Sequence, residues 1–125
     1  MTDKIFRENP SKTKSEIIEI IKQKCALNEL IIIPRQPYDM LGHSDGMVRW
    51  IDENSVLVND FSNESKSFND RLIRSLKKYG LNIKFMKYGD GFFSKTRDWG
   101  AYLNFIKIKD ILIVPIYGIV DDDVA

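Results

Sequence analysis

The sequence has little of the two residue types that carry much side-chain chemistry. It contains one cysteine, Cys25, and one histidine, His43, among 125 residues. A single cysteine excludes an internal disulfide and favours a reducing, cytoplasmic location, although secretion of a longer parent protein stays open. A single histidine argues against a metal site, which needs three or four ligands, so we expect no bound metal.

The sequence also lacks an excess of positive or negative charge, and it lacks long apolar runs. The formal net charge is +1, so the charge balance indicates neither nucleic acid nor an anionic membrane surface as a partner. No apolar run reaches the length that spans a bilayer, and the start of the chain is charged, unlike a signal peptide. With 43% hydrophobic and 30% charged residues, the chain is typical of one globular domain.

A helix near the N-terminus is predicted by its start signal and by its apolar spacing. Thr13 and Glu16 have the spacing of a capping box. The helix then carries an apolar stripe, which consists of Ile17, Ile18, Ile21 and Cys25. On this stripe we expect Cys25 to be a small buried hydrophobe rather than a reactive thiol.

A strand, a loop and a hairpin are predicted after this helix. The β-branched run 30–33 ends at Pro34 and predicts a buried strand, and the polar residues 35–45 predict a loop. Residues 47–51 and 56–58 flank a polar turn, which predicts a β-hairpin.

The same order of elements recurs in the second half of the chain. Ser67 and Asp70 predict the start of a helix, and Gly80 suits its end. The apolar face of this helix consists of Phe68, Leu72, Ile73 and Leu76. A strand over 81–86, a loop over 89–98 and a hairpin of 101–108 with 111–114 are predicted to follow.

The recurrence of helix, strand, loop and hairpin predicts a duplicated architecture. The spacing of about fifty residues is within the range that indicates a propeller or an array. We therefore expect a single α/β domain over 1–125, with one unit at about 1–61 and a second at about 62–120.

The segment Gly42-His43-Ser44-Asp45-Gly46 is the strongest candidate for chemistry. In a strand-like edge, the spacing of His43 and Asp45 puts both side chains on the same side. An imidazole beside a carboxylate can transfer protons near neutral pH, and a carboxylate alone can bind a guanidinium through two parallel hydrogen bonds. A purely structural pair is the alternative.

The longer run 37–52 resembles the agmatine deiminase and bacterial-type peptidylarginine deiminase family, within the pentein superfamily of guanidine-modifying enzymes. Two further stretches agree in order and spacing. One runs from Thr2 to Pro10, and the other comprises 102–105, 114–118 and the acidic residues 121–123. The resemblance therefore covers nearly the whole chain.

The resemblance implies a five-bladed α/β propeller of ββαβ units, of which this chain would form about two. It implies a reaction in which a cysteine thiolate attacks the guanidinium carbon, ammonia or an amine leaves, and water hydrolyses the thiouronium intermediate. His43 would protonate the leaving nitrogen and then activate water, and Asp45 would hold the cation. No cofactor is implied.

The sequence departs from the family at the nucleophile. The family's cysteine lies beyond the hairpin that ends at Val114, and Cys25 does not match it. We therefore expect a fragment of a guanidine C–N hydrolase that is inactive alone, with a small guanidine such as agmatine or arginine as the substrate. The alternatives are a non-catalytic guanidinium-binding module and a fragment that self-associates through exposed propeller edges.

Two other residues are candidates for substrate contact. Asn104 is a polar residue on an otherwise apolar side of its predicted strand, where it contacts substrate or is buried and satisfied by the backbone. Trp99 ends the second long loop and either lines the site or packs in the core. Trp50 either lines the substrate pocket or packs in the core, and packing in the core is expected.

Overall fold

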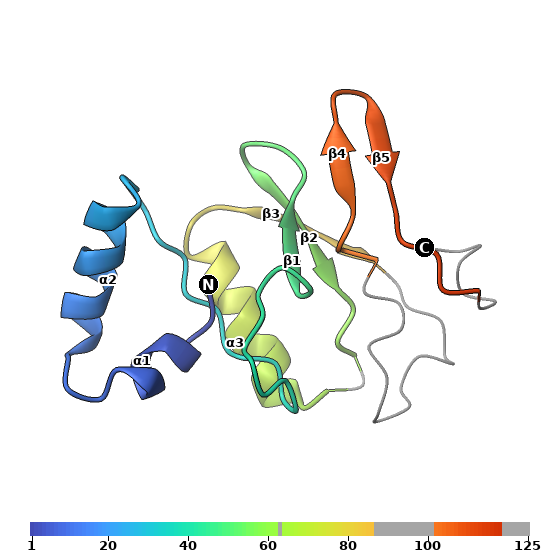
Figure 1. Cartoon of the computed structure of the whole chain (residues 1–125). Coiled ribbons are helices and arrows are strands. Elements are labelled where there is room, and N and C mark those ends of the chain that lie inside the picture. The colour runs from blue at the N-terminus through green and yellow to red at the C-terminus, as the bar shows by residue number, and fades with distance from the viewer. Residues whose placement is uncertain (63, 87–101, 119–125) are drawn as a thin grey trace. The chain divides into compact units, whose positions relative to one another are not determined.

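The computed structural model describes residues 1–62, 64–86 and 102–118, which form a mixed α/β structure with short helices and two small sheets (Figure 1). By its contacts the chain divides into two compact parts. The helical part comprises Met1–Ser44 and Ser62–Gly80, and the sheet part comprises Asp45–Phe61 and Leu81–Ala125. Among the helices described, none combines the length and the apolar character needed to cross a bilayer.

The helical part contains α1 (Lys4–Glu8), α2 (Lys14–Lys24) and α3 (Lys66–Lys77). The predicted capping box opens α2, because the Glu16 N–H donates to the Thr13 hydroxyl at 3.2 Å and the Thr13 N–H donates to the Glu16 carboxylate at 2.7 Å. Ile17 is buried, and Ile18 and Ile21 are half-buried. The predicted helix is therefore confirmed, and so is its apolar stripe from Ile17 to Ile21.

The prediction that Cys25 is buried is wrong. Cys25 is the C-cap residue of α2 and is exposed. Its N–H still donates to the Ile21 carbonyl at 2.9 Å. Because the helix ends there, the side chain lies past the turn that buries Ile17, and the apolar spacing no longer determines its environment.

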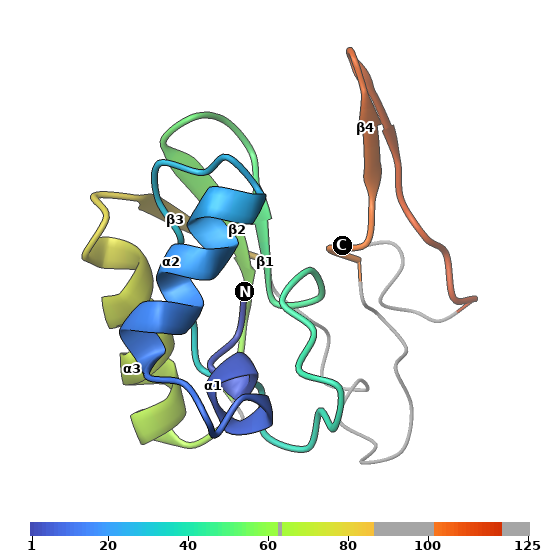
Figure 2. The same cartoon turned by 60° about the vertical axis from the view of Figure 1, so that its left-hand side comes forward.

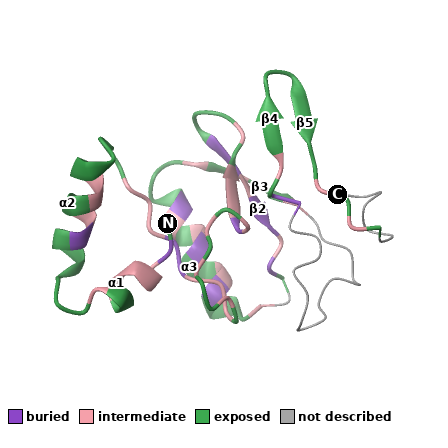
Figure 3. Ribbon diagram, viewed as in Figure 1, coloured by how far each residue is buried: buried purple, intermediate pink, exposed green. Residues whose placement is uncertain are grey.

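The helix α3 begins earlier than predicted, and its apolar face is confirmed. Ser65 rather than Ser67 is the N-cap, and its hydroxyl accepts the Phe68 N–H at 3.3 Å. Ser65 has the extended backbone that a cap requires, whereas Ser67 lies within the first helical turn. Phe68, Leu72 and Leu76 form a buried stripe along α3 (Figure 3).

Residues 30–33 form a single parallel bridge rather than the predicted strand. Ile33 pairs with Thr2. The Ile33 N–H donates to the Met1 carbonyl at 2.9 Å, and the Asp3 N–H donates to the Ile33 carbonyl at 2.8 Å. Pro34 follows at once and has no N–H to continue the ladder. The bridge therefore holds the first residues of the chain beside this segment.

The sheet part contains a three-stranded sheet of β1 (Val48–Trp50), β2 (Ser55–Asn59) and β3 (Asn82–Met86). Strands β1 and β2 form the predicted antiparallel hairpin, and β2 pairs with β3 in parallel. The chain passes from β2 to β3 through α3, so the order over these elements is ββαβ. Val56 and Val58 on β2 are buried.

The prediction that Trp50 packs in the core is wrong. Trp50 is 54% exposed. It is the last residue of β1, next to the turn that leads into β2, and so lies at the margin of a short strand. Its partner across the sheet, Val56, is buried.

A second hairpin is formed by β4 (Ile106–Ile108) and β5 (Ile111–Ile113), which pair antiparallel and run side by side in Figure 1. Figure 2 shows the same hairpin nearly edge-on. The hairpin is confirmed, although β4 is shorter than the predicted run from 101. The Arg49 guanidinium of β1 donates to the Phe105 carbonyl at 2.7 Å and lies 5.0 Å from the centre of the Phe105 ring. This contact anchors the base of the hairpin within the sheet part.

Candidate functional site

The predicted pair lies at the boundary between the two parts in the sequence. His43 belongs to the helical part, and Asp45 is the first residue of the sheet part. Both side chains are exposed. The segment forms a bend at Ser44 and a turn over 45–47, so the strand-like edge assumed for the pair is not present. Because Ser44 alone separates the two residues, chain geometry keeps their Cα atoms within about 7 Å.

Asp39 organises the loop that leads to His43. Its carboxylate accepts the Leu41 N–H at 2.8 Å and the His43 N–H at 2.5 Å. The same carboxylate lies 3.7 Å from the His43 Nδ1 atom, a separation at which the two form an ion pair when the imidazole is protonated. The structure therefore gives His43 a carboxylate neighbour within its own part of the chain.

The electrostatics of Asp39 follow from these backbone donors. Partial burial pushes the pKa of the Asp39 carboxyl upward. The N–H groups of Gly42, Leu41 and His43, together with the charge of His43, outweigh that effect and bring the pKa below its usual value. Asp39 is therefore held as a carboxylate.

The role of Asp39 in this loop has a signal in the sequence. An aspartate whose side chain accepts the N–H two residues later forms an Asx turn, and Asp39 stands in that position relative to Leu41. The spacing to His43 is that of a local contact. The prediction instead considered only the carboxylate that follows the histidine.

Gly42 has a conformation and a contact that fix the start of the motif. Its φ is +76°, and a Cβ added there would lie 2.6 Å from the Cδ atom of Lys4. The hydroxyl of Thr2, a residue that is only 4% exposed, donates to the Gly42 carbonyl at 2.8 Å. The N-terminal stretch that contributes to the resemblance thus holds the motif glycine in place.

The turn that carries Asp45 is fixed from the sheet part. The Asn59 side-chain amide donates to the Gly46 carbonyl at 2.5 Å, and the Asn59 backbone N–H donates to the Met47 carbonyl at 3.1 Å. Met47 is buried. Asp45 has no hydrogen bond or ion pair to another described residue, so its carboxylate is accessible to a ligand.

The other predicted site residues are less well placed by the structure. Asn104 precedes β4 and is exposed, so the alternative of a buried asparagine satisfied by the backbone is wrong. Contact between Asn104 and substrate stays a prediction. Trp99 and the loop over 89–98 lie outside the described residues. Within the ranges described, no three His, Cys, Asp or Glu side chains are grouped as metal ligands.

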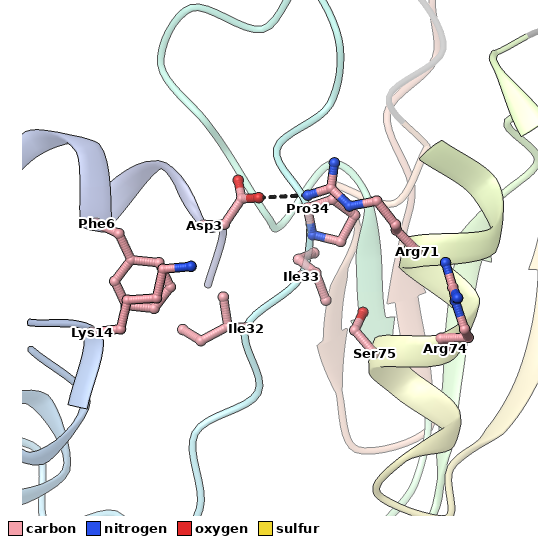
Figure 4. A pocket seen from close by; sticks show the side chains of 9 residues that line it. All are labelled: Asp3, Phe6, Lys14, Ile32, Ile33, Pro34, Arg71, Arg74 and Ser75. Atoms are coloured by element: carbon pink, nitrogen blue, oxygen red, sulfur yellow. Dashed lines mark hydrogen bonds and ion pairs between the residues drawn. The ribbon is translucent and has the colours of Figure 1, made fainter. Parts of the chain in front are cut away.

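The helical part contains an open hollow of about 300 Å³ (Figure 4). Its lining includes the apolar residues Ile32, Ile33 and Pro34, together with Asp3 and the cations Lys14, Arg71 and Arg74. The Asp3 carboxylate is engaged by the Arg71 guanidinium at 2.8 Å and by the Arg35 N–H at 2.9 Å. The remaining positive charge disfavours a guanidinium ligand, and neither His43 nor Asp45 lines this hollow.

The chain shares its fold with solved deiminase structures. C. jejuni agmatine deiminase matches with a TM-score of 0.75 and 23% identity, over 98% of this chain and 39% of that chain. A Cys-to-Ser variant of C. jejuni agmatine deiminase with substrate bound matches with a TM-score of 0.69 and 26% identity, over 92% of this chain and 37% of that chain. A crystal structure of a candidate peptidyl-arginine deiminase matches with a TM-score of 0.73 and 17% identity, over 98% of this chain and 42% of that chain.

These structural neighbours are enzymes of the family that the motif resembles, and the chain spans about two-fifths of their length. No protein-family model matches the sequence. No curated protein matches it either. The structural neighbours thus agree with the resemblance of the motif.

Proposed function

We propose that residues 1–125 form part of a guanidine C–N hydrolase of the deiminase type, and that His43 and Asp45 belong to its substrate site. The observation that carries the proposal is that a Gly-His-x-Asp-Gly motif, with an accessible histidine and aspartate, lies on a chain whose fold matches part of agmatine deiminase. The finer architecture proposed is a partial pentein propeller of about two units, 1–61 and 62–120. The ββαβ order over β1, β2, α3 and β3 supports a repeating unit of this kind, although these four elements cross the proposed boundary between residues 61 and 62.

Asp45 is the proposed guanidinium clamp. Its carboxylate is exposed and has no polar partner among the residues described, whereas the turn that carries it is anchored at Gly46 and Met47. A fixed carboxylate can accept two parallel hydrogen bonds from a guanidinium and hold its planar carbon in one orientation for attack.

His43 is the proposed general acid and base. Its side chain is 62% exposed and so is accessible to a substrate, and its backbone is fixed by Asp39. The imidazole would protonate the nitrogen that leaves and would then take a proton from water. The Asp39 carboxylate would stabilise the positive charge that the ring carries between these two steps.

The nucleophile is proposed to be a cysteine other than Cys25. Cys25 terminates α2, and neither its position nor its surroundings link it to the motif. The agmatine deiminase structure with substrate bound carries a Cys-to-Ser substitution. Our chain covers 37% of that protein. The proposed substrate is a small guanidine such as agmatine or arginine, the proposed location is the cytoplasm, and no cofactor is proposed.

The test uses the protein expressed from the whole open reading frame that encodes these residues. It is incubated with agmatine, free arginine and a peptide that ends in arginine, and the release of ammonia and of the ureido product is measured. We expect one of these to be hydrolysed, with one ammonia released for each ureido group formed. Asp45→Asn should lower kcat/KM by about a hundredfold.

Asp110→Asn is the matched control, because Asp110 is exposed between β4 and β5. It should retain the activity of the unsubstituted protein. Guanidine binding without ammonia release would favour the alternative of a non-catalytic binding module. If no guanidine is bound or hydrolysed at millimolar concentration, the proposal is wrong.

A further inference from the structure

Asn59, the last residue of β2, is a buried amide in contact with the turn that carries Asp45. It is only 4% exposed. Its side-chain Nδ2 donates to the Gly46 carbonyl, and its backbone N–H donates to the Met47 carbonyl. Two consecutive carbonyls of the turn are thus bound by one residue that lies 13 positions away from Gly46.

The orientation of this amide is set by its partner. A carbonyl oxygen only accepts hydrogen bonds, so the NH₂ group of Asn59 must face Gly46. The Oδ1 atom is then buried and has no hydrogen-bond partner in the described part of the chain. A buried acceptor without a partner destabilises a fold. An apolar side chain of the same size would avoid that cost, so the use of an amide points to the bond with Gly46.

The hydrogen bond from Asn59 to the Gly46 carbonyl acts directly beside Asp45. Gly46 is the residue after Asp45, and nothing lies within 4 Å of a Cβ added there, so no side chain packs against that side of Gly46. The side-chain hydrogen bond from Asn59 is therefore the restraint on the Gly46 carbonyl, beside the buried Met47 and the bond from the Asn59 backbone N–H to the Met47 carbonyl. Small changes in this backbone would redirect the exposed carboxylate.

We propose that Asn59 is the positioning residue for Asp45, holding its carboxylate in the orientation that binds a guanidinium. This inference rests on the function proposed for Asp45. Asn59 does not touch the substrate and acts only through the turn. Its loss should therefore weaken substrate binding without removing a reacting group.

Two variants of Asn59 and one control test this role. Asn59→Asp keeps the shape of the side chain, but its carboxyl can donate to Gly46 only when protonated. Asn59→Leu removes the donor at every pH while keeping the same number of side-chain heavy atoms. Asn54→Asp is the control, because it makes the same chemical change at an exposed position between β1 and β2.

The first measurement is hydrogen exchange of the backbone amide of residue 59, whose N–H donates to the Met47 carbonyl of the turn, in the 125-residue chain between pH 5 and 9. For Asn59→Asp we expect protection to fall by about tenfold as the pH rises through the titration of the new carboxyl, whose pKa burial raises. Asn59→Leu should show the loss at all pH values, and Asn54→Asp should match the unsubstituted chain. Unchanged protection in Asn59→Leu would overturn the inference.

The second measurement is steady-state kinetics of the protein from the whole reading frame. Both Asn59 variants should raise KM for the guanidine by about tenfold with kcat nearly unchanged, and the effect of Asn59→Asp should grow with pH. A KM unchanged in both variants would also overturn the inference. If the unsubstituted protein hydrolyses no guanidine, the proposed function fails, and the exchange measurement alone then decides whether Asn59 fixes the turn.

Discussion

Single side chains that bind backbone carbonyls and N–H groups hold both ends of the motif. Thr2 binds the Gly42 carbonyl, Asp39 binds the His43 N–H, and Asn59 binds the Gly46 carbonyl. Each of these side chains is short and polar, and each satisfies a backbone group of the loop. The loop residues before and after the division at Ser44 are therefore each held by side chains of their own part of the chain.

The conformation of Gly42 leads to a prediction about stability. Gly42→Ala should lower the free energy of unfolding by about 1–2 kcal/mol, because an L side chain at positive φ is strained. The added Cβ would also displace Lys4 and press on Thr2. Gly46→Ala is the control and should change stability by less than about 0.5 kcal/mol, since its Cβ would enter open space. Urea unfolding of both variants measures the difference, and equal effects would contradict the prediction.

The carboxylate of Asp39 leads to a prediction about pH. Its pKa is lower in the folded chain than its usual value of 3.8, so the stabilisation it gives is complete above that value. The stabilisation is lost as the pH falls through the folded-state pKa. A ¹³C NMR titration should place the Asp39 midpoint below 3.8. Protection of the Leu41 and His43 amides should decline over the same range.

Asp39→Asn is the control for this titration, because it keeps an acceptor oxygen that does not titrate. The two amides should then keep a constant protection across the acidic range. A midpoint of Asp39 at or above its usual value would show that the backbone donors do not hold the carboxylate.

Elements with a local signal could be predicted from the sequence, and elements that depend on distant partners could not. The capping box of α2, the apolar face of α3 and both hairpins depend on spacings of a few residues. The bridge at Ile33 depends instead on Thr2, about thirty residues earlier, and its pairing partner has no sequence signature. The end of α2 at Cys25 was missed because apolar spacing does not mark where a helix stops.

The start of α3 provides a test between the predicted cap and the observed one. Ser65→Ala should lower the free energy of unfolding by about 1 kcal/mol, because the Phe68 N–H loses its acceptor. Ser67→Ala should be neutral or slightly stabilising, since alanine is the better helix former by about 0.5 kcal/mol. Urea unfolding followed by circular dichroism compares the two, and a larger loss in Ser67→Ala would restore the predicted start.

At the scale of the whole molecule, the motif could be found from the sequence, but its supports could not. His43 and Asp45 stand out because residue types and spacing suffice to find them. Thr2 lies 40 residues from Gly42, and Asn59 lies 13 residues from Gly46, so only folding brings them to the motif. The strand predicted from residue 101 includes Asn104, whereas β4 begins only at Ile106 and leaves Asn104 outside it.

The second hairpin leads to a prediction about association. Every residue of β4 and β5 is exposed, and Ile106, Ile108, Ile111, Leu112 and Ile113 are each more than half exposed (Figure 3). The 125-residue chain should therefore self-associate as its concentration rises, with a second copy covering this surface. Sedimentation at several concentrations measures this, and Leu112→Lys should shift the equilibrium toward the monomer. A strictly monomeric, folded chain would contradict the expectation.

The central claim is that Asp45 binds a guanidinium while His43 lies beside it. The most direct measurement is a crystal structure of the protein from the whole reading frame with bound agmatine, in a variant made inactive at its nucleophile. We predict two nitrogen atoms of one guanidinium at about 2.8 Å from the two Asp45 carboxylate oxygens. The His43 ring should lie within hydrogen-bonding distance of the same group. A guanidinium bound elsewhere, with Asp45 in solvent, would contradict the claim.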